Sequence, residues 1–407
     1  MLKVQPLEGL YPAKHLAHQV ASVPYDVVDR DEARELAADT PASLLHIERA
    51  EIDLPDDTDP YSDEVYATAA ANLARFRREG ILLAEERPVY YVYRQRMDGH
   101  VQTGIAAACH IEDYENDLIR KHEKTRREKE DDRTRLIHQL NANTSPVFLT
   151  YRNSQALARL VEETTDTEPF ADFVAPDGVE HAVWKVTATG PFSEALGALD
   201  AAYVADGHHR TASAVRVGRE RREANPSHRG DEPYNWFLCV LFPADQLRIL
   251  PYNRVVSDLN GHHKSEFLRL AAARVSLPPD STPTPGGPGD IRMYLDGDWY
   301  RLGWSPDPSA SPSEQLDVAG LQERLLAPVL GVDDPRSSRR IQFIGGIRGT
   351  DELERLVDSG RAEVAFSMYP TTVGQLMAIA DAGQIMPPKS TWFEPKLRSG
   401  LFIHLLE

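Results

Sequence analysis

Hydrophobic and polar positions follow two different periods along the chain. Residues 30–50 and 61–79 place apolar side chains at every third or fourth position, which predicts two helices. Residues 88–111 instead alternate β-rich runs on both sides of the dipeptide Asp98-Gly99. That dipeptide is typical of a tight type I′ turn, so this segment is predicted to be a β-hairpin.

Strand-like and helix-like segments continue to alternate after residue 145. The predicted strands are 145–151, 181–187, 201–204, 235–242 and 248–256, and the predicted helices are 154–163, 191–201, the residues after 210, and 263–274. A second hairpin is expected at Asp296-Gly297, between the Pro-rich stretches 277–290 and 305–314, and helices and strands alternate again in the last ninety residues. The pattern predicts an α+β fold with mixed sheets.

Composition and charge restrict the class of protein. The 407 residues include 45 Lys and Arg against 63 Asp and Glu, which gives a formal net charge of −18. This acidic balance disfavours a dedicated nucleic-acid or membrane-surface binder, so neither partner is expected. We expect a cytoplasmic protein, because the N-terminus lacks an apolar signal region and no stretch reaches 18 apolar residues. Cys109 and Cys239 lie in apolar surroundings without metal spacing and are expected to be buried. The oligomeric state stays open.

The segment Ala205–Arg210 (ADGHHR) is the strongest candidate for a site. It lies between a β-rich run and an amphipathic helix, and such a junction offers backbone N–H groups and the positive end of a helix to an anion. Gly207 permits a tight turn, and Arg210 can clamp a phosphate with two hydrogen bonds. Alternatively, Asp206 is only a helix cap and the histidines are surface residues.

Three further segments combine chemistry-bearing residues with plausible structural roles. In VPYDVV (23–28), Pro24 restricts Val23 to an extended backbone, and the segment is either a pocket wall or a polar strand end. Residues 120–133 mix charges of both signs, which is typical of a solvated helical face, and they lack the HExxH spacing of a zinc site. The segment 386–401 is either a surface tail or a cationic wall around the site.

These four blocks together resemble the DUF1015 family. Their order, from VPYDVV through RKHEKTRREKEDDR and ADGHHR to MPPKSTWFEPKLRSGL, extends the resemblance over nearly the whole chain. The family is similar to the ParB/sulfiredoxin superfamily, which includes kinases of free L-serine and holds phosphate groups on a box of glycine, histidine and arginine. The resemblance therefore implies a ParB/sulfiredoxin-like core enlarged by insertions.

The resemblance also implies roles for individual residues. Asp206 is expected to be a metal ligand for Mg²⁺ or a proton acceptor, and Glu123 is a candidate general base. Expected catalytic residues are Asp206, His208, His209 and Glu123. Expected phosphate-binding residues are Gly207, His208, His209, Arg210 and Lys124. Expected substrate-binding residues are Tyr25, Asp26, Arg120, His122, Thr125 and Lys389.

The sequence pattern and the resemblance together predict three domains. Residues 1–275 form the catalytic core with the inserted hairpin and the charged segment, 276–315 a loop-flanked β-hairpin insertion, and 316–407 a C-terminal α/β region that completes the site.

The predicted function is Mg²⁺-dependent phosphoryl transfer to the hydroxyl of free L-serine or a similar small substrate. The donor is pyrophosphate, ADP or ATP. The sequence contains no GxxxxGK[ST] motif, no GxGxxG after a strand and no protein-kinase motif set, so a P-loop or protein-kinase fold is not expected. Two alternatives stay open: a nucleotide- or anion-binding ParB-like regulatory module without catalysis, and a metal-dependent phosphohydrolase that uses His208 and His209 as ligands.

Overall fold

The computed structural model describes residues 1–305 and 307–407 and divides into two compact units. The first unit comprises residues 1–247 and 395–407, and the second comprises 248–394. The domain limits expected at 275/276 and 315/316 both fall inside the second unit. These limits do not separate compact units, because the hairpin at Asp296-Gly297 pairs with residues 365–367 of the same unit and belongs to its sheet.

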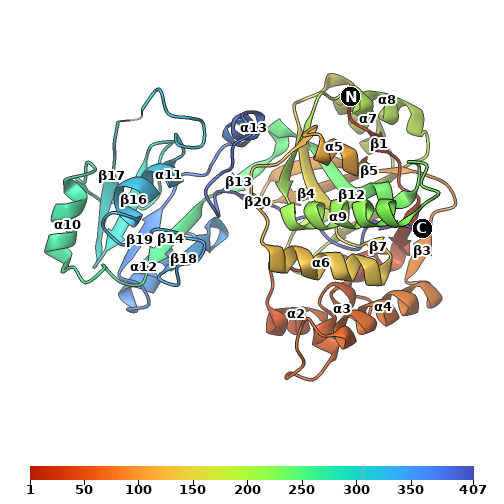
Figure 1. Cartoon of the computed structure of the whole chain (residues 1–407), viewed down its shortest axis with the longest axis horizontal. Helices are drawn as coiled ribbons and strands as arrows, with labels where there is room; N and C mark the ends of the chain where they lie inside the picture. Colours follow the sequence, from red (N-terminus) through yellow and green to blue (C-terminus); the bar gives the residue numbers. More distant parts are fainter. Residues whose placement is uncertain (306) are drawn as a thin grey trace. The chain divides into compact units, whose positions relative to one another are not determined.

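A nine-stranded mixed sheet forms the centre of the first unit (Figure 1). Its order is β6 (Ile119–Arg120), β11 (Ala202–Asp206), β8 (Val147–Tyr151), β12 (Trp236–Pro243), β5 (His100–His110), β4 (Tyr90–Met97), β10 (Glu180–Val186) and β9 (Ala171–Val174), with β1 (Val4–Gln5) beside β5. Two pairs are parallel, β11 with β6 and β12 with β8, and the other pairs are antiparallel.

The predicted hairpin is confirmed as β4 and β5. Met97 pairs with His100 across the turn, and both turn residues have positive φ, 50° at Asp98 and 77° at Gly99. These values are the backbone conformation that a type I′ turn requires, which is why an Asp-Gly dipeptide stands there.

Helices pack around this sheet and around a smaller one. They are α1 (Ala17–Val20), α2 (Arg30–Ala37), α3 (Leu45–Glu48), α4 (Asp63–Arg78), α5 (Ile111–Glu115), α6 (Arg127–Leu140), α7 (Gln155–Thr165), α8 (Thr189–Gly197) and α9 (His208–Ala224). The smaller sheet has the order β3 (Leu82–Ala84), β2 (Gly9–Pro12), β21 (Ile403–Leu405) and β7 (Ala142–Asn143). Helix α6 packs against α9 on one side and α4 on the other, as Figure 1 shows. The single helix expected over 30–50 is two helices, because the chain turns at residues 38–44 between α2 and α3.

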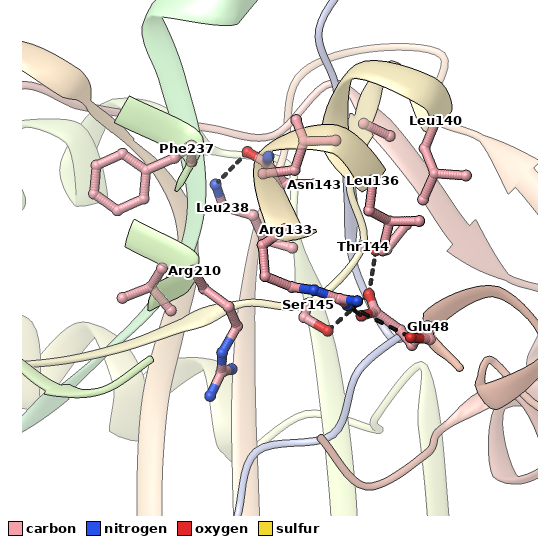
Figure 2. A pocket seen from close by; sticks show the side chains of 14 residues that line it. Glu48, Arg133, Leu136, Leu140, Asn143, Thr144, Ser145, Arg210, Phe237 and Leu238 are labelled. Carbon is pink, nitrogen blue, oxygen red and sulfur yellow. Dashed lines mark hydrogen bonds and ion pairs between the residues drawn. The ribbon is translucent and has the colours of Figure 1, made fainter. Parts of the chain in front are cut away.

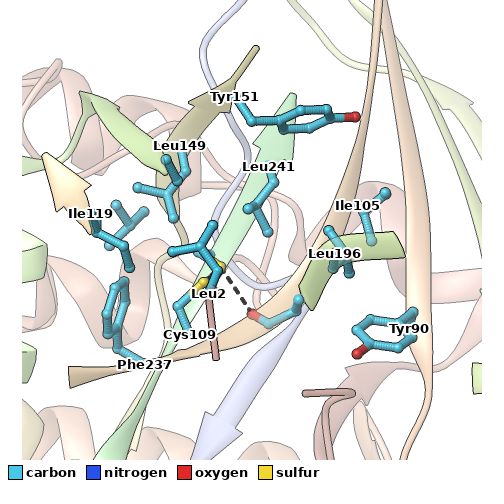
Figure 3. Packing of buried hydrophobic residues seen from close by; sticks show 14 of the residues in the cluster. Leu2, Tyr90, Ile105, Cys109, Ile119, Leu149, Tyr151, Leu196, Phe237 and Leu241 are labelled. Carbon is cyan, nitrogen blue, oxygen red and sulfur yellow. Dashed lines mark hydrogen bonds between the residues drawn. The ribbon is translucent and has the colours of Figure 1, made fainter. Parts of the chain in front are cut away.

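The main core of the first unit lies between the large sheet and its helices (Figure 3). Phe237 and Leu241 of β12, Ile105 of β5 and Leu196 of α8 are fully buried in it. Cys109 and Cys239 are confirmed as buried thiols, with their sulfur atoms 3.3 Å apart on neighbouring strands.

The pairing at one edge of the sheet positions the candidate site. Because β6 runs parallel to β11, the residues that follow Arg120 and those that follow Tyr203 leave the sheet at the same end. Strand β8 runs antiparallel to β11, so its first residues lie beside the last residue of β11, and Phe148 pairs with Asp206. A β-bulge between Val204 and Asp206 shifts this register, and bulges commonly re-aim a side chain at a strand end.

The second unit contains a six-stranded sheet and a two-stranded sheet. The larger has the order β15 (Pro279–Asp280), β17 (Asp298–Leu302), β16 (Ile291–Leu295), β19 (Val364–Ser367), β14 (Tyr252–Val256) and β18 (Ile341–Gly345), and the smaller pairs β13 (Arg248–Leu250) with β20 (Trp392–Glu394). The helices are α10 (Lys264–Ala272), α11 (Asp317–Leu321) with a π-helical continuation over Gln322–Leu326, α12 (Asp351–Asp358) and α13 (Val373–Asp381). Pro251 separates β13 from β14, so the single strand expected over 248–256 is two.

The fold class predicted from the sequence, α+β with mixed sheets, is confirmed. The ParB/sulfiredoxin-like identity of the core stays a prediction. Within the described residues, no helix combines the length and the apolar character needed to cross a bilayer.

Candidate functional site

The turn between β11 and α9 is built around Gly207. Gly207 is the N-cap of α9 and has φ 91°, a left-handed conformation that favours glycine. Asp206 is therefore the last residue of β11 and not the helix cap that the sequence left open. The first turn of α9 carries His208, His209 and Arg210, so three side chains surround backbone N–H groups that have no partner within the helix.

Arg210 folds back across this turn. A β-carbon on Gly207 would stand 3.0 Å from Cζ of Arg210, so glycine is needed for space as well as for conformation. One guanidinium nitrogen of Arg210 donates a hydrogen bond to the Pro146 carbonyl, and another lies 3.9 Å from Oδ1 of Asp206. The side chain is only 7% exposed, and its Nε has no hydrogen-bond partner in the described part of the chain. Arg210 is therefore a buried residue of this turn.

Charged neighbours keep Arg210 and Asp206 ionised despite their burial. Burial lowers the pKa of Arg210, but the nearby carboxylates of Asp26 and Asp206 outweigh it and raise that pKa. Burial raises the pKa of Asp206, and the cations of Lys396 and Arg210 more than reverse it, so the pKa ends well below its usual range. Oδ1 of Asp206 accepts the Gly207 N–H at 2.8 Å and Oδ2 accepts the Lys396 ammonium at 3.1 Å. Both carboxylate oxygens of Asp206 are therefore engaged.

A cluster of two histidines and one carboxylate lies beside this turn. Nε2 of His122 and Nε2 of His208 are 3.4 Å apart, and the rings meet edge to face. A ligand atom of Glu123 completes a group whose members all lie within 4.8 Å of one another. Burial lowers the pKa of His122 to about 4 and also lowers the pKa of His208, so both rings are neutral near pH 7. The predicted residues His122, Glu123 and His208 thus come together.

Four other predicted residues of this region make different contacts. His209 accepts the Arg126 backbone N–H at Nε2 over 3.0 Å, and the Thr125 hydroxyl donates to Glu130 at 3.0 Å. Arg120 donates to the Asp117 carbonyl and lies over the Tyr203 ring, and Lys124 is exposed. These contacts do not test the roles expected for the four residues.

Tyr25 and Asp26 approach the turn from the N-terminal region. Tyr25 is 4% exposed, and the guanidinium of Arg133 lies over its ring at 4.0 Å. Burial raises the pKa of the Tyr25 phenol, so it is protonated at neutral pH. Asp26 is exposed, and its charge is the main one that raises the pKa of Arg210. The 23–28 block and the 205–210 block therefore share one electrostatic environment.

A buried polar network centred on Glu48 adjoins the site and was not identified from the sequence (Figure 2). Arg133 donates to Glu48 at 3.1 Å and to Asp132 at 2.9 Å, and the hydroxyls of Thr144 and Ser145 also donate to Glu48. Residues 120–133 are typical in sequence of a solvated helical face, and this interpretation is wrong at Asp132 and Arg133, which are both buried. Glu48 lies at the end of a four-residue helix, where no motif points to it.

Two cavities lie around Glu48 and Arg133. The cavity that extends to Arg210 measures about 30 Å³, which is room for one or two water molecules (Figure 2). The neighbouring cavity measures about 110 Å³ and is lined by side chains of both charges together with Tyr25. Its charged lining residues are Glu48, Arg49, Glu51, Lys129, Asp132 and Arg133.

The C-terminal segment contributes to the first unit through residues 395–399. Lys396 donates to Asp206, the Ser399 hydroxyl contacts Ser145 Oγ at 2.6 Å, and Arg398 donates to Nε2 of buried His181 at 3.2 Å. This part of the 386–401 block is therefore not a surface tail. Lys389 belongs to the second unit, where its ammonium lies 5.5 Å from the Tyr252 ring centre and its carbonyl accepts a hydrogen bond from Arg254.

Several solved structures are similar to this chain at low sequence identity. A free serine kinase in complex with AMP is 12% identical, with a TM-score of 0.38 over 73% of this chain and 92% of the kinase. A conserved hypothetical protein from Pyrococcus furiosus is 12% identical, with a TM-score of 0.37 over 73% of this chain and 93% of its own. At TM-scores below 0.5, these similarities carry no weight for the activity of this chain.

The family comparison covers most of the sequence. No curated protein matches the chain. The family model described as "Protein of unknown function (DUF1015)" matches residues 4–319, which include the 23–28, 120–133 and 205–210 blocks. The resemblance drawn from these blocks is confirmed, and the chain belongs to the DUF1015 family.

Proposed function

We propose that the protein is a small-molecule phosphotransferase whose donor binds at the N-terminus of α9. The observation that carries the proposal is Arg210, a buried guanidinium whose Nε has no hydrogen-bond partner among the described residues. It lies in the first turn of a 17-residue helix, where the helix dipole and backbone N–H groups favour an anion. A phosphate group has the charge and the acceptor oxygens that this arrangement lacks.

Phosphoryl transfer depends mainly on positioning and on neutralising charge, and the residues around α9 suit both tasks. Arg210 and the N–H groups of the first turn would bind donor oxygens, while Lys396 and Asp206 hold the turn in place. Asp26 and Glu123 are the candidate general bases for the proton of an acceptor hydroxyl. Tyr25 is kept protonated and would donate a hydrogen bond.

The donor is pyrophosphate, ADP or ATP, used with Mg²⁺. Asp206 was expected to bind the metal, but its two oxygens accept hydrogen bonds from Gly207 and Lys396. A cation at Asp206 would have to replace the Lys396 ammonium. Mg²⁺ would supply charge neutralisation on the donor phosphates.

The acceptor is a small hydroxyl compound with charges of both signs, such as free L-serine. The 110 Å³ cavity beside Tyr25 is lined by carboxylates and by guanidinium and ammonium groups. Such a lining suits a zwitterion, whose ammonium and carboxylate each find an opposite charge. The remaining substrate contacts are those predicted for Arg120, His122 and Thr125.

The direct test is the formation of O-phosphoserine from L-serine. Purified full-length protein with Mg²⁺ is incubated with serine and with pyrophosphate, ATP or ADP in turn, and the products are measured by phosphorus NMR and mass spectrometry. We expect a phosphate ester with one of the three donors. Homoserine, threonine and glycerate in place of serine define the acceptor.

Two outcomes would contradict the proposal. A folded sample that forms no ester with any donor and acceptor would exclude the kinase activity and favour a binding module. A sample that releases inorganic phosphate at the same rate with and without an acceptor would identify a phosphohydrolase.

A further inference from the structure

We infer that His122, Glu123 and His208 form a binding site for one transition-metal ion of the Zn²⁺ class. The inference rests on the arrangement of these three side chains and holds whether or not the protein transfers phosphoryl groups. No sequence motif indicates the site, because its ligands come from two segments 85 residues apart.

The fold brings the ligands together through the pairing of two parallel strands. His122 and Glu123 follow β6, and His208 is the first residue of α9, which follows β11. Strands β6 and β11 are neighbours in the sheet and run in the same direction. The backbone therefore fixes the two loops side by side, and a metal would not have to gather its ligands from mobile segments.

The distances match those of a shared metal ion. Two imidazole nitrogens, each about 2.05 Å from one tetrahedral zinc, are about 3.4 Å apart. Nε2 of His122 and Nε2 of His208 are 3.4 Å apart, and all three ligand groups lie within 4.8 Å of one another. Two histidines and one carboxylate leave a fourth position for water or a substrate oxygen, as in sites where zinc is catalytic.

The histidine pair is poorly satisfied without a metal. His122 is 1% exposed and His208 6%, and the contact between their Nε2 atoms is long for a hydrogen bond. Nδ1 of His208 is buried without a hydrogen-bond partner in residues 1–305 and 307–407. A metal bound by both Nε2 lone pairs would replace this weak contact. Nδ1 of His122 is likewise buried without a hydrogen-bond partner in these residues.

The ligand chemistry selects the class of metal. Imidazole nitrogen suits Zn²⁺ and neighbouring transition metals, whereas Mg²⁺ and Ca²⁺ take oxygen ligands. This site is therefore distinct from the Mg²⁺ that would accompany a phosphate donor. The carboxylate of Asp206 is not part of it, since Asp206 already binds Lys396 and the Gly207 N–H.

The test measures metal content and requires no turnover. Full-length protein is stripped with a chelator, dialysed against Zn²⁺ or Co²⁺, and analysed by mass spectrometry of the metals and by visible absorption of the Co²⁺ form. We expect one ion per chain and the intense visible absorption of four-coordinate Co²⁺. His208→Gln and Glu123→Gln should each weaken binding by at least about 100-fold, because even the loss of an outer partner weakens metal binding 10–100-fold.

The matched control is His138→Gln. His138 is a half-exposed histidine on α6 that binds Glu220 at 2.8 Å, so it offers the same ligand types outside the cluster. We expect this variant to bind one ion with unchanged affinity. Equal loss of metal from all three variants, or no loss from His208→Gln and Glu123→Gln, would overturn the site.

Competition and folding controls complete the design. A tenfold excess of Mg²⁺ over Co²⁺ should leave the Co²⁺ spectrum unchanged, and its loss would overturn the assignment to a transition metal. Thermal unfolding of the stripped proteins checks the variants, and Glu123→Gln keeps the test decisive if His208→Gln unfolds, since Glu123 is not fully buried.

Discussion

The ammonium of Lys396 donates a hydrogen bond of 3.1 Å to Oδ2 of Asp206, across 190 residues of sequence. This contact attaches the C-terminal segment of the first unit to the turn that precedes α9. Asp206 in turn accepts the Gly207 N–H and lies 3.9 Å from Arg210. The position of the Arg210 guanidinium therefore depends on a residue near the end of the chain.

The first prediction concerns Lys396→Met, which removes the charge and keeps most of the side-chain volume. Lys396 is the nearest positive charge that lowers the pKa of Asp206, so its loss should raise that pKa and lower the melting temperature. Breaking a partly buried pair of this kind costs on the order of 1–3 kcal/mol. A double-mutant cycle with Asp206→Asn, followed by thermal unfolding, measures the coupling between the two residues.

The control for this cycle is Lys14→Met. Lys14 is largely exposed and lies 4.0 Å from an exposed carboxylate of Glu168, so its replacement should change stability by less than about 0.5 kcal/mol. If Lys396→Met and Asp206→Asn have additive effects on the free energy of unfolding, the interaction between the two side chains does not stabilise the turn.

The second prediction concerns Gly207→Ala. An alanine at φ 91° loses about 1–2 kcal/mol relative to glycine, and its β-carbon would also stand 3.0 Å from Cζ of Arg210. Gly178→Ala is the matched control, since Gly178 has φ 81° and nothing within 4 Å of an added β-carbon. We expect both variants to lose stability, and only Gly207→Ala to lose affinity for pyrophosphate or nucleotide in calorimetry. Equal affinities for the two variants would show that the close approach of Arg210 does not matter for binding.

Local patterns predicted much of the fold because they act over short distances. The Asp98-Gly99 turn, the strand over 236–243 and the helix after Gly207 each follow from periodicity and turn chemistry within about twenty residues. The limits of the units did not follow, because they depend on pairing between distant strands. The hairpin of β16 and β17 reads as an insertion in the sequence, yet β16 pairs with β19, some seventy residues later.

The site was predicted where one short segment carries it and missed where distant residues build it. Residues 205–210 are contiguous, so their chemistry is visible in the sequence. Glu48 is a single acidic residue in a short helix, and only the folded chain brings Arg133, Thr144 and Ser145 to it. Arg133 itself lies in a mixed-charge run that resembles a solvated helix, and its burial against α3 is a tertiary effect.

The third prediction concerns the pH dependence of stability through His181. His181 is fully buried between Tyr93 and Phe173, and Arg398 donates to its Nε2. Burial, together with the Arg398 charge, lowers the pKa of His181 to about 3, whereas an unfolded histidine titrates near 6.5.

The sign follows from proton uptake by the unfolded chain. Below pH 6.5 the unfolded state binds a proton that the folded state does not, so this stabilising contribution is lost as the pH falls from 6.5 towards 3. Between pH 7.5 and 5.0 the loss is about 2 kcal/mol. Denaturant unfolding of wild type and His181→Gln at pH 7.5 and 5.0 should show the variant's disadvantage shrinking by about this amount. A constant difference between wild type and His181→Gln would contradict the low pKa.

The fourth prediction compares Arg210→Lys with Arg219→Lys on the same helix. Lysine keeps the charge but loses the planar fork that binds two phosphate oxygens, and it cannot fold back over Gly207 in the same way. If Arg210 binds the donor, Arg210→Lys should lower kcat/KM for the donor by about 10²–10³, the usual loss when one donor to a phosphoryl or acyl oxygen is removed. Arg219 is more than half exposed and pairs with Glu115, so Arg219→Lys should retain wild-type kinetics. Steady-state rates at varied pyrophosphate, ATP and ADP measure both variants.

Burial of Arg210 predicts a loss of stability as well, which thermal unfolding separates from the kinetic effect. Wild-type kinetics in a folded Arg210→Lys protein would exclude the Arg210 guanidinium as a donor contact, because the lysine leaves the helix dipole and the backbone N–H groups unchanged and removes only the guanidinium.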